Sequence, residues 1–157
     1  MSQGLTPYLC CADAAASIDF YTTVFGAVEV QRWTARDGRI GHAELELAGQ
    51  RLFLADEHPE IGVRRPRALG GTAVSFVLTV PDADATVARA VDAGAILERP
   101  VTMQPFGARA GWVVDPFGHR WNVQTPVEQV SIQRLRERVS DQYDIAVSTR
   151  GRRVTGR

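Results

Sequence analysis

The sequence predicts an α+β fold built from two tandem βαβββ units and a C-terminal helix. The first observation is a repeat, because LCCADAAASIDFYTTVFGA at residues 9–27 is echoed by LTVPDADATVARAVDAGA at residues 78–95. The second is that three strand-like stretches follow each copy of the repeat. A chain of 157 residues is long enough for two such small units packed together.

Each copy of the repeat is expected to begin as a strand and continue as a helix. Asp13 and Asp82 are placed to cap the helix N-termini, and the helices should end near Gly26 and Gly94. Apolar residues recur at helical spacing in both copies: Ala14, Ile18, Tyr21 and Phe25, then Ala83, Val87 and Ala90 or Val91. Each helix should therefore bury one stripe of side chains.

The strands that follow the helices are separated by turn signals. We expect strands at AVEVQRWTA, GHAELELAG and QRLFLADE in the first unit, and at AILERPVTM, AGWVVD and HRWNVQT in the second. The turns are Asp37-Gly38, Gly49 and Asp115-Pro116-Phe117-Gly118. The expected organisation is a first unit over residues 1–56, a Gly-, Pro- and Arg-rich linker over 57–71, a second unit over 72–126, and a C-terminal part over 127–157.

In the C-terminal part we expect a helix from about Ser131 to Tyr143, followed by a flexible basic tail, STRGRRVTGR. No aromatic residues interleave the tail arginines, and the formal net charge of the chain is zero, so we expect no nucleic-acid partner. No apolar run approaches the ~20 residues that cross a bilayer, and Met1 to Gly4 lead directly into a strand-like segment, so we expect no signal peptide. We therefore expect a cytoplasmic protein with no membrane partner.

Two motifs resemble the vicinal oxygen chelate superfamily, which includes glyoxalase I, extradiol dioxygenases, and the fosfomycin and bleomycin resistance proteins. They are D-x-A-x-S-I-D-F-Y-x-x-x-F-G-A in the first helix and D-P-F-G-H-R-W in the last hairpin. The resemblance covers residues 5 to 125 and is strongest to a bacterial glyoxalase-like branch whose members mostly lack an assigned reaction. It implies units that curl into a half-barrel sheet around a cavity, and a homodimer in which chains often exchange units.

The resemblance also maps the four metal-ligand positions of the superfamily onto Thr6, Phe53, Ser75 and Asn122. A divalent cation needs carboxylate, imidazole or thiolate ligands at most of these places, and these residues do not supply them. We therefore expect no metal or other cofactor. The alternative is one divalent metal held by His42 and Glu44, with or without His119. The simplest interpretation of His119 is a hairpin residue that packs near Trp121.

Strand alternation predicts which side chains line the cavity, because successive residues point to opposite faces. On this basis, together with the aromatic residues and the resemblance, the candidate ligand-binding residues are Tyr8, Glu46, Phe53, Ser75, Arg109, Trp112, Arg120 and Asn122. Arg109 matches an arginine in the G-D-R-x-G pattern of the resembling branch, although Ala108 replaces its usual acidic neighbour. His42 and Glu44 are the catalytic candidates, because an imidazole beside a carboxylate can act as a general base. The alternative is that they form the solvent-facing side of a half-exposed strand, with no catalytic role.

The expected function is binding of a small aromatic or amphiphilic molecule in the cavity without a metal. A metal-dependent lyase, isomerase or dioxygenase acting on vicinal oxygens is the alternative. A third hypothesis is a subunit that only pairs with a partner, and the polar cavity face argues against it. A cationic ligand would find the carboxylates of Glu44 and Glu46 on one strand.

Overall fold

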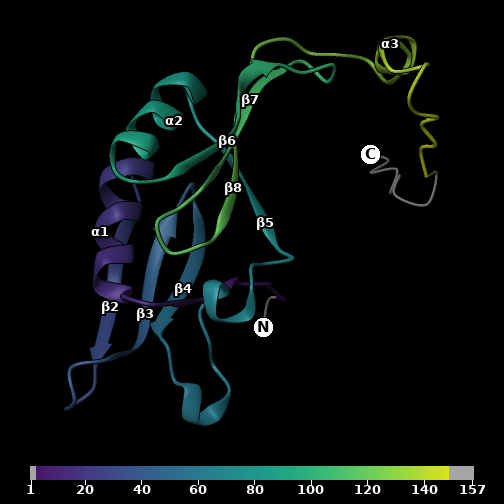
Figure 1. The fold of residues 1–157 in the computed structure, drawn as a ribbon. Coiled ribbons are helices and arrows are strands. Elements are labelled where there is room, and N and C mark those ends of the chain that lie inside the picture. Colours follow the sequence, from purple (N-terminus) through teal and green to yellow (C-terminus); the bar gives the residue numbers. More distant parts are fainter. Residues whose placement is uncertain (1–2, 149–157) are drawn as a thin grey trace, which may run out of the picture.

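Each half of the chain forms one four-stranded sheet (Figure 1). The computed structural model describes residues 3–148. The first sheet has the order β1-β4-β3-β2, from β1 (Tyr8–Cys11), β2 (Val28–Thr34), β3 (Ile40–Leu47) and β4 (Gln50–Asp56). The second has the order β5-β8-β7-β6, from β5 (Ser75–Thr79), β6 (Ile96–Met103), β7 (Ala108–Val114) and β8 (Arg120–Pro126). The α+β class and the two βαβββ units are confirmed, and neither sheet closes into a barrel.

The two helices lie on the same side of the molecule and begin at the predicted caps (Figure 1). The Asp13 carboxylate accepts a hydrogen bond from the Ala16 amide at the start of α1 (Ala14–Phe25), and Asp82 does the same at the start of α2 (Ala83–Asp92). Gly26 ends α1 with a φ of 74°, a left-handed conformation that glycine adopts without strain.

The remaining segments lie outside the sheets. Two short 3-10 turns, η1 (Pro59–Ile61) and η2 (Pro66–Leu69), occupy the connection between the units. The C-terminal helix α3 (Ile132–Arg138) stands away from both sheets (Figure 1). It is shorter than predicted, because the Ser140 hydroxyl hydrogen-bonds the Glu137 carbonyl just where the helix ends. Most of the predicted basic tail falls on residues 149–157, outside the described residues.

Strand alternation divides each sheet into an apolar face and a polar face, as predicted. The apolar faces point toward the helices and are buried, at Leu9, Leu45, Leu52 and Leu54 in the first sheet and at Leu78, Val113, Trp121 and Val123 in the second. These residues and the helix stripes form one continuous core that spans both units. We call the opposite faces the first open face and the second open face. No helix among residues 3–148 has the length and apolarity that a membrane span requires.

A buried carboxylate joins the two units. Asp115, in the turn between β7 and β8, is 0% exposed and accepts a 2.6 Å hydrogen bond from the Tyr21 hydroxyl of α1. It also accepts hydrogen bonds from the Trp121 indole and from the backbone amides of Phe117 and His119, each at 2.9 Å. Four donors thus satisfy a carboxylate that would otherwise be costly to bury. The D-P-F-G-H motif consequently fastens the second unit to the helix of the first.

The Asp115→Asn substitution tests whether these hydrogen bonds hold the two units together. An amide offers a single acceptor oxygen to the four donors and points N–H groups at some of them, so we expect the free energy of unfolding to fall by about 2–4 kcal/mol. Urea denaturation followed by circular dichroism measures the change. The matched control is Asp92→Asn at an exposed site on α2, which should leave the midpoint unchanged. Equal midpoints for the two variants would contradict the structural role of Asp115.

Candidate functional site

The first open face gathers most of the residues predicted to act chemically. In the strand register Trp33 of β2 lies opposite His42 of β3. Phe53 of β4 lies between two neighbours, Glu44 of β3 on one side and Tyr8 of β1 on the other. Directly opposed residues share a face of the sheet, so strands β1, β2, β3 and β4 all contribute to this site. Glu46 lies on the same face, one step further along β3 and exposed.

Three side chains on this face form a hydrogen-bonded series. The Tyr8 hydroxyl lies 2.8 Å from Nδ1 of His42, and Nε2 of His42 lies 3.1 Å from a carboxylate oxygen of Glu44. The guanidinium of Arg51 is 3.8 Å from the other oxygen of Glu44. The predicted pairing of His42 with Glu44 therefore has a geometric basis, and the structure adds Tyr8 to it.

Aromatic rings surround the imidazole of His42. Its ring centre is 5.0 Å from that of Trp33, 5.0 Å from that of Phe53 and 5.4 Å from that of Tyr8, all in edge-on arrangements. Trp33 is 61% exposed, and Tyr8 is 56% exposed. The face therefore combines flat apolar surface with an acid, an imidazole and a phenol that a ligand can reach.

The surroundings set the protonation of the two end groups of the series. The hydrogen bond from His42 is the main reason that the pKa of Glu44 lies below its ordinary value, and a hydrogen bond from Gln31 acts in the same direction. Partial burial raises the pKa of the Tyr8 phenol. At neutral pH Glu44 is therefore a carboxylate and Tyr8 a neutral phenol.

The second open face holds four of the other predicted residues. Arg120 lies over the Trp112 ring, with the guanidinium carbon 4.1 Å from the ring centre, and it also contacts the hydroxyl of Ser75 at 3.2 Å. Glu98 orients this guanidinium through a 2.6 Å hydrogen bond. The Asn122 side chain is buried and donates to the Gly111 carbonyl at 3.5 Å. Among the described residues, no hydrogen bond, ion pair or ring contact links this group to the first open face.

Arg109 lies apart from the other predicted ligand-binding residues. It is out of phase with Trp112 along β7 and pairs in register with Thr125, so it points toward the helix-covered side. There its guanidinium binds the carboxylate of Asp84 on α2 through hydrogen bonds of 2.8 and 2.9 Å. The structure thus gives Arg109 a place on the surface of the helix layer and brings it to neither open face.

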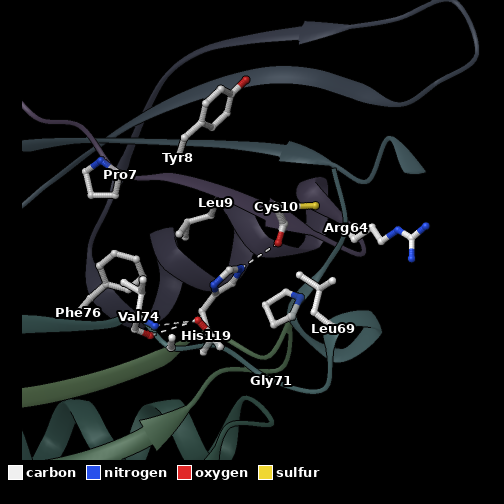
Figure 2. A pocket seen from close by; sticks show the side chains of 13 residues that line it. Pro7, Tyr8, Leu9, Cys10, Arg64, Leu69, Gly71, Val74, Phe76 and His119 are labelled. Atoms are coloured by element: carbon white, nitrogen blue, oxygen red, sulfur yellow. Dashed lines mark hydrogen bonds between the residues drawn. The ribbon is translucent and has the colours of Figure 1, made fainter. Parts of the chain in front are cut away.

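His119 connects the two units rather than simply finishing a hairpin. Its Nε2 lies 2.9 Å from the backbone carbonyl of Cys10 in β1 (Figure 2). The same nitrogen lies 4.0 Å from the sulfur of Cys11. The imidazole lines a hollow of about 410 Å³ between β1 and the linker, and a neighbouring hollow of about 420 Å³ shares Tyr8, Leu9 and Cys10 with it. Of the predicted ligand-binding residues, only Tyr8 borders these hollows.

The side chains at the four mapped metal positions do not fit a divalent cation. Phe53 has no donor atom, and Thr6 and Ser75 offer neutral hydroxyls. The Asn122 amide is engaged with a backbone carbonyl. Within residues 3–148 no three His, Cys, Asp or Glu side chains are grouped closely enough to hold a metal ion. His42 and Glu44 lie together, but His119 is bound to β1 and does not complete a set with them.

Some of the side chains at these faces, Gln31 and Arg99 among them, were not predicted from the sequence. Gln31 hydrogen-bonds Glu44 and accepts from the Trp33 indole at 3.1 Å, and Arg99 lies 5.9 Å from the centre of the Trp112 ring. The Asp37-Gly38 turn was the sequence signal that could have identified Gln31, because that turn pairs β2 with β3 and so places Gln31 opposite Glu44. Register shifts in β2 and in β6 obscure simple alternation there.

Comparison with known proteins agrees with this fold. The model of the Glyoxalase/Bleomycin resistance protein/Dioxygenase superfamily matches residues 5–123. An uncharacterized protein of Mycobacterium bovis is 41% identical over 147 residues, covering 92% of this chain and 97% of that protein. TioX from Micromonospora sp. ML1 is 27% identical, with a TM-score of 0.62 over 80% of this chain and 100% of that one. The fosfomycin resistance protein FosX of Listeria monocytogenes shares the fold. It is 14% identical, with a TM-score of 0.61 over 86% of this chain and 99% of that one.

The contact of His119 with β1 predicts the reactivity of the two thiols. Burial raises the pKa of Cys11 to about 12, so native Cys11 should resist iodoacetamide, whereas the partly exposed Cys10 should react slowly. The His119→Ala substitution removes a hydrogen bond of about 1 kcal/mol, which corresponds to a roughly fivefold faster labelling of Cys11 by local opening. Peptide mass spectrometry measures both rates. The control is His58→Ala in the linker, and equal Cys11 labelling in both variants would contradict the assignment.

Proposed function

Because the chain belongs to the Glyoxalase/Bleomycin resistance protein/Dioxygenase superfamily, we propose that it binds a small aromatic or amphiphilic molecule against its open faces, without a resident metal. The observation that carries the proposal is that each open face presents an aromatic ring, exposed at Trp33 and half-buried at Trp112, beside groups that bind by hydrogen bonds or charge. On the first face these are Trp33 with His42, and on the second Trp112 with Arg120.

The two faces offer complementary chemistry to one ligand. The first open face carries the carboxylates of Glu44 and Glu46, and the second carries the guanidinium groups of Arg99 and Arg120. Flat rings supply rigid contact area, while charged groups at either end fix the orientation of a molecule that has both polar and apolar parts. This composition favours an amphiphilic aromatic ligand over a purely apolar one.

A homodimer is the second part of the proposal. The outer strands β2 and β6 leave large apolar side chains in solvent, including Val28 at 64% exposure and Ile96 at 59%. Such apolar edges are typical of surfaces that another chain covers. A second copy placed over them would set the first open face of one chain against the second open face of its partner, and the ligand site would then take residues from both chains.

The binding proposal is tested with 1-anilinonaphthalene-8-sulfonate, an amphiphilic aromatic probe, titrated by fluorescence. Trp112→Ala removes the stacking ring and the partner of Arg120, so we expect the dissociation constant to rise roughly tenfold, as for the loss of one stacking and one cation–π contact. Phe106→Ala is the control, because Phe106 is a half-exposed aromatic residue in the β6–β7 turn. Equal loss of affinity in both variants, or in neither, would contradict the proposed site.

The dimer is tested by light scattering coupled to size-exclusion chromatography. The wild type should run with the mass of two chains, and Val28→Lys on β2 should shift it to one, because a charge would be buried in the apolar interface. Val91→Lys on α2 changes the same residue type at 40% exposure and should leave the mass unchanged. A wild-type mass of one chain would refute the dimer.

A further inference from the structure

The series of Tyr8, His42 and Glu44 has the order found in groups that move protons: a hydroxyl, an imidazole and a carboxylate. The two heavy-atom separations, 2.8 and 3.1 Å, are those of hydrogen bonds. The residues come from two strands, β1 and β3, and β4 lies between them in the sheet. His42 and Glu44 meet by alternation along β3, whereas the contact of Tyr8 with His42 is a consequence of the fold and not of local sequence.

The hydrogen bonds define the tautomer of His42. Glu44 is ionised at neutral pH and can only accept, so Nε2 of His42 must carry the hydrogen. In the neutral imidazole Nδ1 is then bare and accepts the hydrogen of the Tyr8 hydroxyl. Among residues 3–148, the other acceptor near this hydroxyl is the Gly41 carbonyl, at the longer distance of 3.4 Å.

We propose that Tyr8, His42 and Glu44 form a proton relay that removes an acidic proton from a planar molecule held on the first open face. The suitable class is a C–H or O–H acid conjugated to an electron-withdrawing ring or carbonyl. The inference rests on the proposed function, because the relay acts on a ligand that the same face binds. It adds an activity to what is otherwise a binding site.

The step conserves atoms and electrons. The phenol oxygen of Tyr8 takes the proton of the bound acid as its own proton passes to Nδ1 of His42. The bond from the acidic atom to hydrogen breaks, and its electron pair remains on the ligand, which becomes an anion. His42 becomes an imidazolium, stabilised by the carboxylate of Glu44. Return of the proton by the same route restores the starting state. If water protonates the ligand anion instead, the hydroxide that forms takes the extra proton from His42, with the same result.

The surroundings hold the relay in place and leave its end accessible. Gln31 and Arg51 contact Glu44, so its carboxylate is fixed toward His42. Trp33 and Phe53 flank the imidazole and limit its rotation. Tyr8 is more than half exposed, so its hydroxyl can meet a ligand directly. Tyr8 is therefore the catalytic residue, and Glu44 is a positioning residue.

The test uses 5-nitrobenzisoxazole, a planar C–H acid that opens to a coloured cyanophenolate when a base removes its single acidic proton. Binding is measured separately, by quenching of tryptophan fluorescence with the unreactive planar analogue 6-nitrobenzotriazole. The variants are Tyr8→Phe, His42→Gln and Glu44→Gln. The controls are Tyr143→Phe, at an exposed tyrosine of the C-terminal segment, and His58→Gln in the linker.

The relay predicts that Tyr8→Phe and His42→Gln each lower kcat by roughly a hundredfold, the usual contribution of general-base catalysis, with KM and analogue binding unchanged. Glu44→Gln should lower kcat by a smaller factor, again without changing KM. Full activity of Tyr8→Phe beside an inactive His42→Gln would overturn the relay, because His42 would then act alone. Analogue binding without any rate enhancement would overturn the relay and leave the proposed function standing. Failure of the analogue to bind would contradict both.

Discussion

The hydrogen bonds to the buried carboxylate of Asp115 are the constraint on which the arrangement of the two units depends. Its acceptor sites are filled by donors from α1 and from its own hairpin, so α1 cannot shift relative to that hairpin without stripping donors from a buried charge. His119 adds a second connection, from the same hairpin to β1. The D-P-F-G-H motif therefore determines how the two open faces are oriented.

The location of the proposed function follows from this arrangement. The helices and the apolar sheet faces pack into one shared core, and the open faces present aromatic, acidic and basic side chains to solvent. The polar residues there are organised rather than merely exposed. His42 is held between rings and a carboxylate, and Arg120 is held between Glu98 and Trp112. Such preorganisation lowers the entropy lost when a ligand is bound.

Much of the fold could be predicted because its signals are local: the repeat, the helix caps and the strand alternation all lie within short windows of sequence. Contacts between distant residues could not. Tyr8 meets His42 across 34 positions and Tyr21 meets Asp115 across 94, and no local pattern specifies either pair. Arg109 was carried over from a family pattern, whereas alternation along β7 places it on the helix side. The C-terminal helix was predicted too long because its polar sequence carries no strong stop signal.

The proposed function requires that side chains alone, without a resident metal, hold a small molecule at the open faces. It is tested most directly by elemental mass spectrometry of untagged protein, purified without chelator and challenged with zinc, nickel, iron(II) and manganese. We expect the metal content of the wild type to match that of a His42→Ala variant, at a level well below one ion per chain. One ion per wild-type chain that is lost in His42→Ala would contradict it.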